Sequence, residues 1–192
     1  MTTCTTSIAT KELEVRYGKT VAVTDVNLDI PAGSLLSVIG PNGAGKSALL
    51  KALAGAVEIH SGDIDIPGPP PSFVMQSTEV DPSLPISVKD VVSLSRYSNR
   101  GVFKRFRKED RDAVDEAIER LNLKDLAKRQ LHELSGGQRQ RVLVAQGLAQ
   151  DSNVLLLDEP INGLDLLSRD IILEMITEEV KAGRTIVLTT HN

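Results

Sequence analysis

Cysteine and aromatic residues are scarce in this sequence. Their scarcity restricts the redox environment in which the protein is expected to work and the residue types that can form its core. Cys4 is the single cysteine, so no disulfide can form within the chain, and reducing surroundings are the simpler inference. Tryptophan is absent and aromatic residues make up 3% of the chain. The core is therefore expected to consist mainly of leucine, isoleucine, valine and alanine side chains.

Long apolar segments are also missing. No run approaches the roughly 18–20 apolar residues that a membrane-spanning helix needs. The N-terminal stretch MTTCTTSIATKELEV lacks the charged and then apolar pattern of a signal peptide. We therefore expect no signal peptide and no transmembrane segment, so any work at a membrane requires another polypeptide to cross it.

The chain has no excess of positive charge. Its formal net charge is −4, which argues against nucleic acid as a partner. The length of 192 residues suits one domain, or one domain with a substantial insertion. We predict a single domain over residues 1–192.

Strand-like and helix-like patterns divide the chain into segments. The apolar run at residues 35–39 predicts a buried strand, and a helical pattern follows at residues 46–54. Residues 60–72 are turn-rich and contain a proline cluster, so they are expected to lack regular structure. Further along, apolar residues at helical spacing predict a helical insert. The expected parts are an α/β core at residues 1–77 and 141–192 and a helical subdomain at about residues 78–140.

A glycine-rich loop at residues 40–47 separates the predicted buried strand from the predicted helix. Its sequence, Gly-Pro-Asn-Gly-Ala-Gly-Lys-Ser, fits the phosphate-loop pattern G-x-x-x-x-G-K-[ST] between a strand and a helix. Backbone N–H groups and the helix N-terminus favour phosphate binding there. Lys46 is expected at the β- and γ-phosphates, and the Ser47 hydroxyl is expected at Mg²⁺. The alternative is a glycine-rich turn that binds nothing.

A second candidate motif ends the apolar run at residues 154–157. Asp158 and Glu159 follow this predicted strand, at the edge where open α/β sheets bind ligands. Asp158 is expected to hold Mg²⁺, and Glu159 to orient or deprotonate an attacking water. The alternative is that both acids cap the next helix. The two motifs together predict nucleotide binding, and Glu159 favours hydrolysis over phosphoryl transfer by a kinase, for which no motif identifies an acceptor site.

The stretch Leu134-Ser-Gly-Gly-Gln138 lies between these motifs and is followed by Arg-Gln-Arg. With the phosphate loop before it and LLLDEP after it, this stretch resembles the signature of the ATP-binding subunits of ABC transporters. The resemblance extends from LEVRYG, which starts at Leu13, to His191. It implies an α/β fold of the P-loop NTPase (ABC-type ATPase) class, with a mixed β core, an antiparallel β subdomain and a helical insert.

In that family the LSGGQ stretch caps the γ-phosphate held by a second subunit, so the resemblance implies a head-to-tail dimer of ATP-binding subunits. The residue types of this stretch suit phosphate binding, because Ser135 supplies a hydroxyl and Gly136 and Gly137 expose backbone N–H groups. The dipole of the following helix also favours negative charge. The alternative is an ordinary serine-capped helix start.

Four further positions take their expected roles from the resemblance alone. Tyr17 matches the aromatic residue that stacks on adenine, and Gln76 matches the glutamine that contacts Mg²⁺ and links the nucleotide to the membrane subunits. Asp165 matches the loop that crosses the dimer interface, and His191 matches the histidine at the γ-phosphate. Taken without the family, these residues read as a surface tyrosine, an ordinary glutamine, a helix cap and a solvated strand end.

The expected site residues fall into three groups. The catalytic residues are Lys46, Glu159 and His191. The ligands of Mg²⁺ bound with ATP are Ser47, Gln76 and Asp158. The ATP-binding residues are Tyr17, Gly40, Pro41, Asn42, Gly43, Ala44, Gly45, Lys46, Ser47, Ala48, Gln76, Ser135, Gly136, Gly137, Gln138, Asp158 and Asp165.

The chain departs from the family pattern in a few places. It ends at Asn192, where members of the family usually continue with a further strand and helices, so we expect the C-terminal part of the fold to be missing, either because the chain is truncated or because it is an unusually minimal member. Ala48 stands where threonine is frequent, and Ile161 and Asn162 stand where serine or threonine is common. Neither change removes a group that the chemistry needs.

The insert sequence at residues 84–126 resembles that of the subfamily serving manganese, zinc and iron importers. The resemblance implies metal-ion uptake through separate integral membrane permease subunits, with a substrate-binding protein, from the cytoplasmic face of the cell membrane. No His, Cys and Asp cluster with metal-ligand spacing is present, so the cargo is not expected to bind this subunit. The alternatives are a soluble ABC-type ATPase of translation or DNA repair, whose second nucleotide domain or long coiled coil is missing here, and a nucleotide-binding module without turnover.

Overall fold

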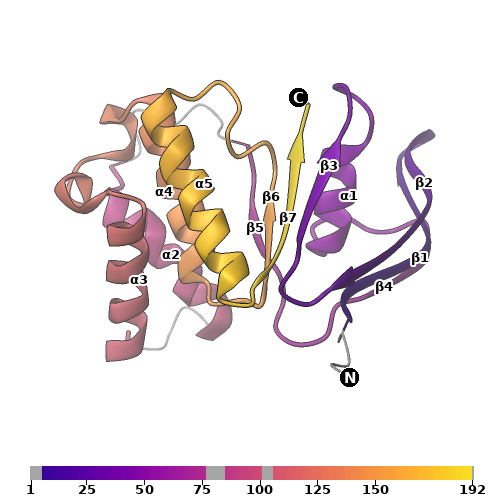
Figure 1. Cartoon of the computed structure of the whole chain (residues 1–192), viewed down its shortest axis with the longest axis horizontal. Helices are drawn as coiled ribbons and strands as arrows, with labels where there is room; N and C mark the ends of the chain where they lie inside the picture. The colour runs from indigo at the N-terminus through magenta and orange to yellow at the C-terminus, as the bar shows by residue number, and fades with distance from the viewer. Residues whose placement is uncertain (1–5, 77–84, 101–105, 192) are drawn as a thin grey trace. The chain divides into compact units, whose positions relative to one another are not determined.

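The antiparallel and the parallel strands of the chain form separate sheets (Figure 1). The computed structural model describes residues 6–76, 85–100 and 106–191, so Cys4 and the expected start of the insert at residue 78 lie outside the described residues. The antiparallel sheet has the order β2-β1-β4. Its strands are β1 (Thr6–Tyr17), β2 (Thr20–Pro31) and β4 (Ser61–Asp65).

Strand β4 corrects the expectation that residues 60–72 lack regular structure. β4 pairs antiparallel with β1, from Ala9 opposite Asp65 to Glu14 opposite Ser61. The prolines of this segment all follow the strand and leave its ladder intact. Gly62 has a φ of 89°, and a Cβ atom there would lie 2.5 Å from two carbonyl oxygens of β1. The glycine that suggested a turn therefore allows close passage of two strands.

The second sheet has the strand order β3-β7-β6-β5 and positions the candidate motifs. β7 pairs in parallel with both β3 and β6, and every residue of β6 is buried, as expected for a strand in a parallel sheet. The carboxyl ends of these three strands therefore meet at one edge. The bounds are β3 (Leu35–Ile39), β5 (Ser72–Val74), β6 (Val154–Leu157) and β7 (Thr185–Thr190).

Helix α1 (Lys46–Leu53) follows β3 and contacts β1, β2 and β7. Its buried Leu49, Leu50 and Leu53 join a core that also includes Ile8 of β1 and Leu156 of β6. The buried members of this core are leucine, isoleucine, valine and alanine. The aliphatic core expected from the lack of aromatic residues is confirmed.

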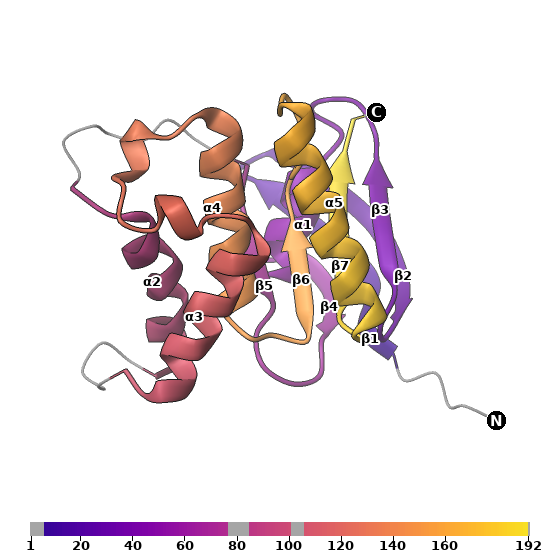
Figure 2. The same cartoon turned by 60° about the vertical axis from the view of Figure 1, so that its left-hand side comes forward.

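Helices α2, α3 and α4 pack against one another (Figure 2). The fully buried Leu121 and Leu123 directly follow α3, whose own inward face carries Val114 and Ile118. The helices are α2 (Val88–Arg100), α3 (Lys108–Arg120), α4 (Gly136–Ala149) and α5 (Leu166–Lys181), with 3₁₀ turns η1 (Lys124–Leu126) and η2 (Leu131–Glu133).

Arg96 ties these packed helices together. From α2, its Nε donates to Oδ1 of Asp110 in α3 at 3.0 Å, and its Nη1 donates to the carbonyl of Ala149 in α4 at 2.9 Å. The Asp110 side chain is 1% exposed, and its other oxygen accepts the backbone N–H of Arg107 at 2.9 Å. This buried ion pair therefore fixes the start of α3 relative to α2 and the end of α4.

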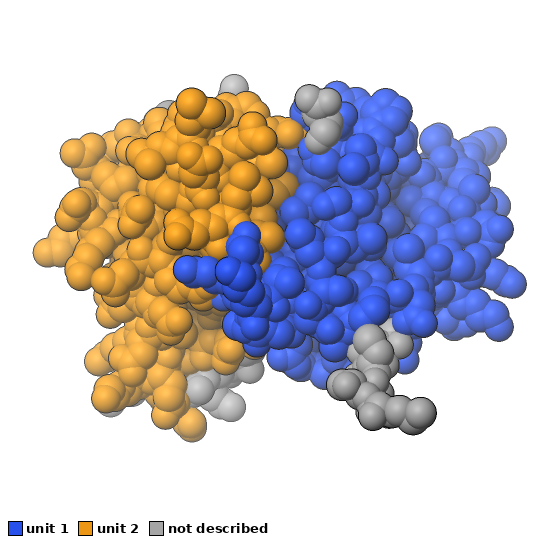
Figure 3. Space-filling model, viewed as in Figure 1, with its two compact units in different colours: residues 1–73, 152–159, 177–192 blue, residues 74–151, 160–176 orange. Residues whose placement is uncertain are grey.

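The chain forms two compact units, coloured separately in Figure 3. The first holds the antiparallel sheet, most of the parallel sheet and α1. The second holds α2, α3, α4 and the start of α5. These elements confirm the expected α/β class with an antiparallel β part; the division of one ATP-binding domain into a core and an insert stays a prediction. The units comprise residues 1–73, 152–159 and 177–192, and residues 74–151 and 160–176.

Candidate active site

The loop of residues 40–45 leads from β3 into α1 and requires glycine at its last position. Gly45 has a φ of 88°, a conformation that favours glycine. A Cβ atom on Gly45 would also overlap the carbonyl oxygen of Ala22 and lie 3.2 Å from Cγ2 of Val23. The first N–H groups of a helix have no partner within it, and they attract anions. The loop and helix start therefore present the arrangement that binds phosphate.

The ammonium group of Lys46 is held inside this loop. Lys46 is 7% exposed, and its Nζ donates to the carbonyls of Gly40 at 2.8 Å and Pro41 at 3.1 Å. It also lies 3.8 Å from Oε1 of Glu159. A buried ammonium needs such partners. Here they hold the positive charge of Lys46 against the backbone of the phosphate loop.

Asp158 and Glu159 directly follow β6 and share a contact with β7. The Asp158 carboxylate is buried and accepts a hydrogen bond from the hydroxyl of Thr189 at 2.7 Å. The backbone N–H of Glu159 donates to the same hydroxyl oxygen at 2.9 Å. Glu159 has a φ of 49°, which is uncommon for a residue other than glycine.

His191 follows β7 and completes this group of charged residues. Its Nδ1 lies 4.0 Å from Oε1 of Glu159, the same oxygen that faces Lys46. The structure therefore brings the three expected catalytic residues, Lys46, Glu159 and His191, together in one compact unit. Oε1 of Glu159 therefore lies near two nitrogen groups, the Lys46 ammonium at 3.8 Å and the His191 imidazole at 4.0 Å.

Two of the expected nucleotide contacts lie at strand ends. Tyr17 ends β1 and its side chain is 49% exposed, so its ring is accessible to a ligand. Gln76 follows β5 and is exposed. Their roles at adenine and at Mg²⁺ stay predictions.

The LSGGQ stretch starts α4 with a reciprocal cap. The Ser135 hydroxyl accepts the backbone N–H of Gln138 at 3.2 Å, and the Gln138 side chain accepts the backbone N–H of Ser135 at 3.0 Å. Ser135 therefore caps the N-terminus of α4, as the alternative interpretation of this stretch predicts. Ser135 and Gly136 are nevertheless exposed, so the cap leaves the helix start accessible to an anion.

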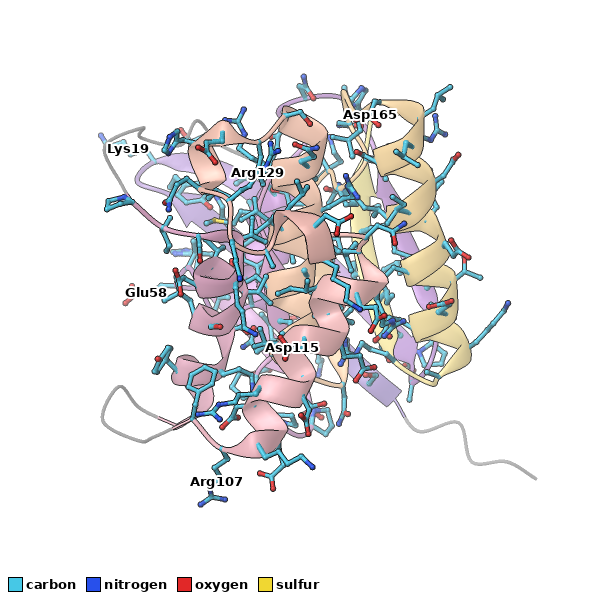
Figure 4. All side chains as sticks on the ribbon, turned by 90° about the vertical axis from the view of Figure 1, so that its left-hand side faces the viewer. Lys19, Glu58, Arg107, Asp115, Arg129 and Asp165 are labelled. Atoms are coloured by element: carbon cyan, nitrogen blue, oxygen red, sulfur yellow. The ribbon has the colours of Figure 1, made fainter. Side chains whose placement is uncertain are left out.

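Asp165, labelled in Figure 4, caps the start of α5 and lies against Gly137. Its Oδ1 accepts the backbone N–H of Ser168 and its Oδ2 accepts the Ser168 hydroxyl, each at 2.9 Å. These bonds hold the pKa of Asp165 below its ordinary value of 3.8, the backbone N–H most strongly, and the Arg141 cation adds to the effect. Burial lowers the pKa of Arg141, an effect that Asp165 partly offsets.

Sequence reasoning missed residues that orient the expected ones. Thr189 contacts both acids, and Ser168 orients Asp165. The sequence contained a pattern that could have identified each of these two residues. A hydroxyl in the buried apolar strand β7 requires a partner, and Ser168 stands three residues after Asp165, at capping-box spacing.

Within residues 6–76, 85–100 and 106–191, no group of three or more His, Cys, Asp or Glu side chains could hold a metal ion. Over the same part of the chain, no helix is long and apolar enough to cross a membrane.

The ABC transporter family profile matches residues 23–162 of this chain. Manganese transport system ATP-binding protein MntB of Listeria innocua is 38% identical over 187 residues, which cover 94% of this chain and 78% of MntB. Both matches include the phosphate loop, the LSGGQ stretch and the two acids after β6.

Solved structures are similar over nearly the whole chain. A protein described as a metal-chelate type ABC transporter, in an inward-facing conformation, has a TM-score of 0.86 and 34% identity, covering 97% of this chain and 73% of that chain. A dimeric ATP-binding cassette, MJ0796, with bound ADP and Pi has a TM-score of 0.81 and 26% identity, covering 96% of this chain and 88% of that chain. These similarities confirm the fold class and the family expected from the sequence. The chain therefore belongs to the ABC transporter family, as one of its ATP-binding, ATP-hydrolysing subunits.

Proposed function

We propose that this ATPase powers the import of a metal ion through a separate membrane permease, with manganese, zinc and iron as the candidate cargoes. The observation that carries the proposal is the 38% identity to a manganese transport ATPase over 94% of the chain. The similarity to a metal-chelate type transporter supports the same class of cargo. In this proposal other subunits bind the cargo; in the part of this chain that the structure describes, no group of three or more His, Cys, Asp or Glu side chains could hold a metal ion.

In the proposed mechanism the phosphate loop binds the phosphates of ATP. Lys46 moves from the loop carbonyls, which it contacts at 2.8 and 3.1 Å, toward the β- and γ-phosphates. Backbone N–H groups of residues 40–48 bind the remaining phosphate oxygens. Tyr17, with its half-exposed ring, stacks on the adenine.

A magnesium ion that enters with ATP would be held by Ser47 and Asp158, which lie in the same compact unit, and Gln76 is assigned to it by the resemblance alone. Ser47, Gln76 and Asp158 offer a hydroxyl, an amide and a buried carboxylate. Oxygen ligands with few protein carboxylates are typical of magnesium sites completed by phosphate and water. When bound, Mg²⁺ neutralises charge on the phosphates.

Glu159 and His191 act on the terminal phosphate in this proposal. Glu159 orients the attacking water and accepts its proton. His191, 4.0 Å from that carboxylate, contacts the γ-phosphate. The near approach of Lys46, Glu159 and His191 in one unit supports this assignment.

A second copy of the chain completes the site. Ser135, Gly136, Gly137 and Gln138 bind the γ-phosphate held by the partner, and Asp165 lies in the loop that crosses between the subunits. The dimeric cassette with bound ADP and Pi supports a dimer as the working state. Closure of the dimer on ATP moves the permease, and hydrolysis reopens it.

The dimer works, in this proposal, at the cytoplasmic face of the cell membrane, bound to integral membrane permease subunits. A substrate-binding protein delivers the metal ion to the permease. No nucleic acid takes part, in keeping with the net charge of −4.

Metal uptake in cells of the source organism tests the proposal. Lys46→Ala in the chromosomal gene removes the phosphate contact, whereas Lys51→Ala, on the same helix α1, serves as the matched control. We expect Lys46→Ala to lower uptake of manganese, zinc or iron from metal-poor medium, while Lys51→Ala leaves it unchanged. Unchanged uptake of all three metals in Lys46→Ala cells would rule out the proposed cargo class.

A further inference from the structure

Thr189 is a buried hydroxyl residue that the proposed mechanism does not use. It lies in β7 after Ile186, Val187 and Leu188, and its exposed fraction is 0%. A hydroxyl in such surroundings is costly without hydrogen-bond partners. Its partners are the two consecutive acids after β6, Asp158 and Glu159.

The direction of both hydrogen bonds is fixed by chemistry. The backbone N–H of Glu159 can only donate, so the Thr189 oxygen accepts there at 2.9 Å. The hydroxyl has one proton, and it is directed at Oδ1 of Asp158 at 2.7 Å. Oδ1 of Asp158 is therefore the acceptor of this bond.

The bond to Glu159 also supports an uncommon backbone conformation. Glu159 has a φ of 49°, which is strained for a residue with a side chain. This conformation directs the carboxylate to within 3.8 Å of Lys46 Nζ and 4.0 Å of His191 Nδ1. Loss of the Thr189 bond would release the turn that aims the Glu159 carboxylate.

We propose that Thr189 is a positioning residue for ATP hydrolysis, whose single hydroxyl fixes the Asp158 carboxylate and the backbone that aims Glu159. The role rests on the proposed functions of Asp158 and Glu159. It gives a role at the site to a residue within β7, two positions before His191.

The competing account is that Thr189 only satisfies buried polar groups and so stabilises the fold. Thr185 provides a matched control, because it lies at the other end of β7 and is 1% exposed. Its hydroxyl oxygen accepts the backbone N–H of Gly33 at 2.9 Å. Thr185→Val therefore removes a comparable buried bond without touching either acid.

Steady-state ATPase kinetics of the full chain with MgATP form the first test. Valine keeps the branched shape of threonine and removes the hydroxyl, whereas serine keeps the hydroxyl. We expect Thr189→Val to lower kcat by about 10- to 100-fold, as loss of a residue that orients a metal ligand does, with little change in KM. Thr189→Ser should restore most of the rate, and Thr185→Val should retain the parent kcat.

Amide hydrogen exchange in the nucleotide-free chain, followed by NMR, provides a readout besides activity. The Glu159 amide should exchange faster in Thr189→Val than in Thr189→Ser or Thr185→Val. A parent kcat in Thr189→Val, an equal loss in Thr185→Val, or unchanged protection of the Glu159 amide would overturn the positioning role. If Thr189→Val does not fold, a parent-like Thr189→Ser still supports the role, and a serine variant without activity despite normal folding contradicts it.

A Glu159→Gln variant separates this inference from the proposal on which it rests. Turnover at the parent rate in Glu159→Gln removes the proposed role of Glu159. Loss of turnover in Glu159→Gln together with parent turnover in Thr189→Val removes the positioning role alone.

Discussion

The carboxylate of Asp165 occupies the space that a Cβ atom on Gly137 would fill. Ser168 is the next nearest residue, with its Oγ 2.6 Å and its Cβ 3.0 Å from that position. The starts of α4 and α5 therefore meet at a residue without a side chain. The second glycine of LSGGQ is required by packing within the chain, in addition to any contact with phosphate.

Gly137→Ala should destabilise the protein, and Gly136→Ala should not. Nothing lies within 4 Å of a Cβ atom on Gly136, so alanine there should leave stability unchanged or raise it by up to about 1 kcal/mol through its higher helix propensity. Alanine at 137 displaces Asp165 and Ser168, at a cost of about 1–3 kcal/mol. Urea unfolding of both variants measures the difference, and equal stability would show that α5 moves aside at no cost.

The lowered pKa of Asp165 predicts a stability contribution that depends on pH. Because the folded-state pKa lies below the ordinary 3.8, the contribution is fully present above that value and is lost as the pH falls through the folded-state pKa. Asp165→Asn keeps a capping oxygen but does not titrate. The difference in unfolding free energy between the parent and Asp165→Asn should therefore be constant from about pH 7 to about pH 5 and shrink toward about pH 3. Ser168→Ala should weaken this dependence, and a difference that is independent of pH would contradict the assigned bonds.

The ion pair of Arg96 with Asp110 should contribute far more to stability than that of Lys89 with Asp115. Both pairs join α2 to α3, but the first side chains are 10% and 1% exposed and the second are 49% and 60% exposed; Asp115 is labelled in Figure 4. Arg96→Met leaves Asp110 buried without its cation and should cost about 3–5 kcal/mol.

The exposed pair provides the control for that measurement. Lys89→Met removes a 2.6 Å contact in solvent, and its loss should cost no more than about 1 kcal/mol. Chemical denaturation compares the two variants. Equal losses of unfolding free energy in the two variants would mean that the buried Arg96 pair stabilises the fold no more than the exposed Lys89 pair does.

Ser135→Arg should separate nucleotide binding from dimer formation. Ser135 is exposed at the start of α4, where a large cation would obstruct a partner subunit but leave the phosphate loop of the same chain intact. We expect normal ATP binding and no ATP-dependent dimer in analytical ultracentrifugation. Ser135→Ala removes the cap, at a cost of about 1 kcal/mol, and the proposed phosphate contact without adding bulk, so it separates loss of the hydroxyl from obstruction by a large side chain. An ATP-dependent dimer of Ser135→Arg would leave LSGGQ as a helix cap alone.

The motifs of the site were predictable because each is local in sequence. The phosphate loop, Asp158, Glu159 and His191 all lie at ends of strands in one parallel sheet, and parallel pairing brings those ends together. Thr189 and the contact of Gly137 with Asp165 were not predictable, because they depend on which side chains meet across elements. Strand β4 was missed for a related reason. Gly62 lets β4 pass close to β1, and the composition of the segment alone cannot distinguish such a glycine from one in a turn.

The central claim is that Glu159 activates the water that hydrolyses ATP bound at the phosphate loop. Glu159→Gln keeps the size of the side chain and removes its ability to accept a proton. ATPase turnover of the purified full chain, measured beside equilibrium ATP binding, tests this directly. We predict that Glu159→Gln binds ATP as the parent does, loses turnover and accumulates as an ATP-bound dimer, whereas hydrolysis at the parent rate would contradict the account.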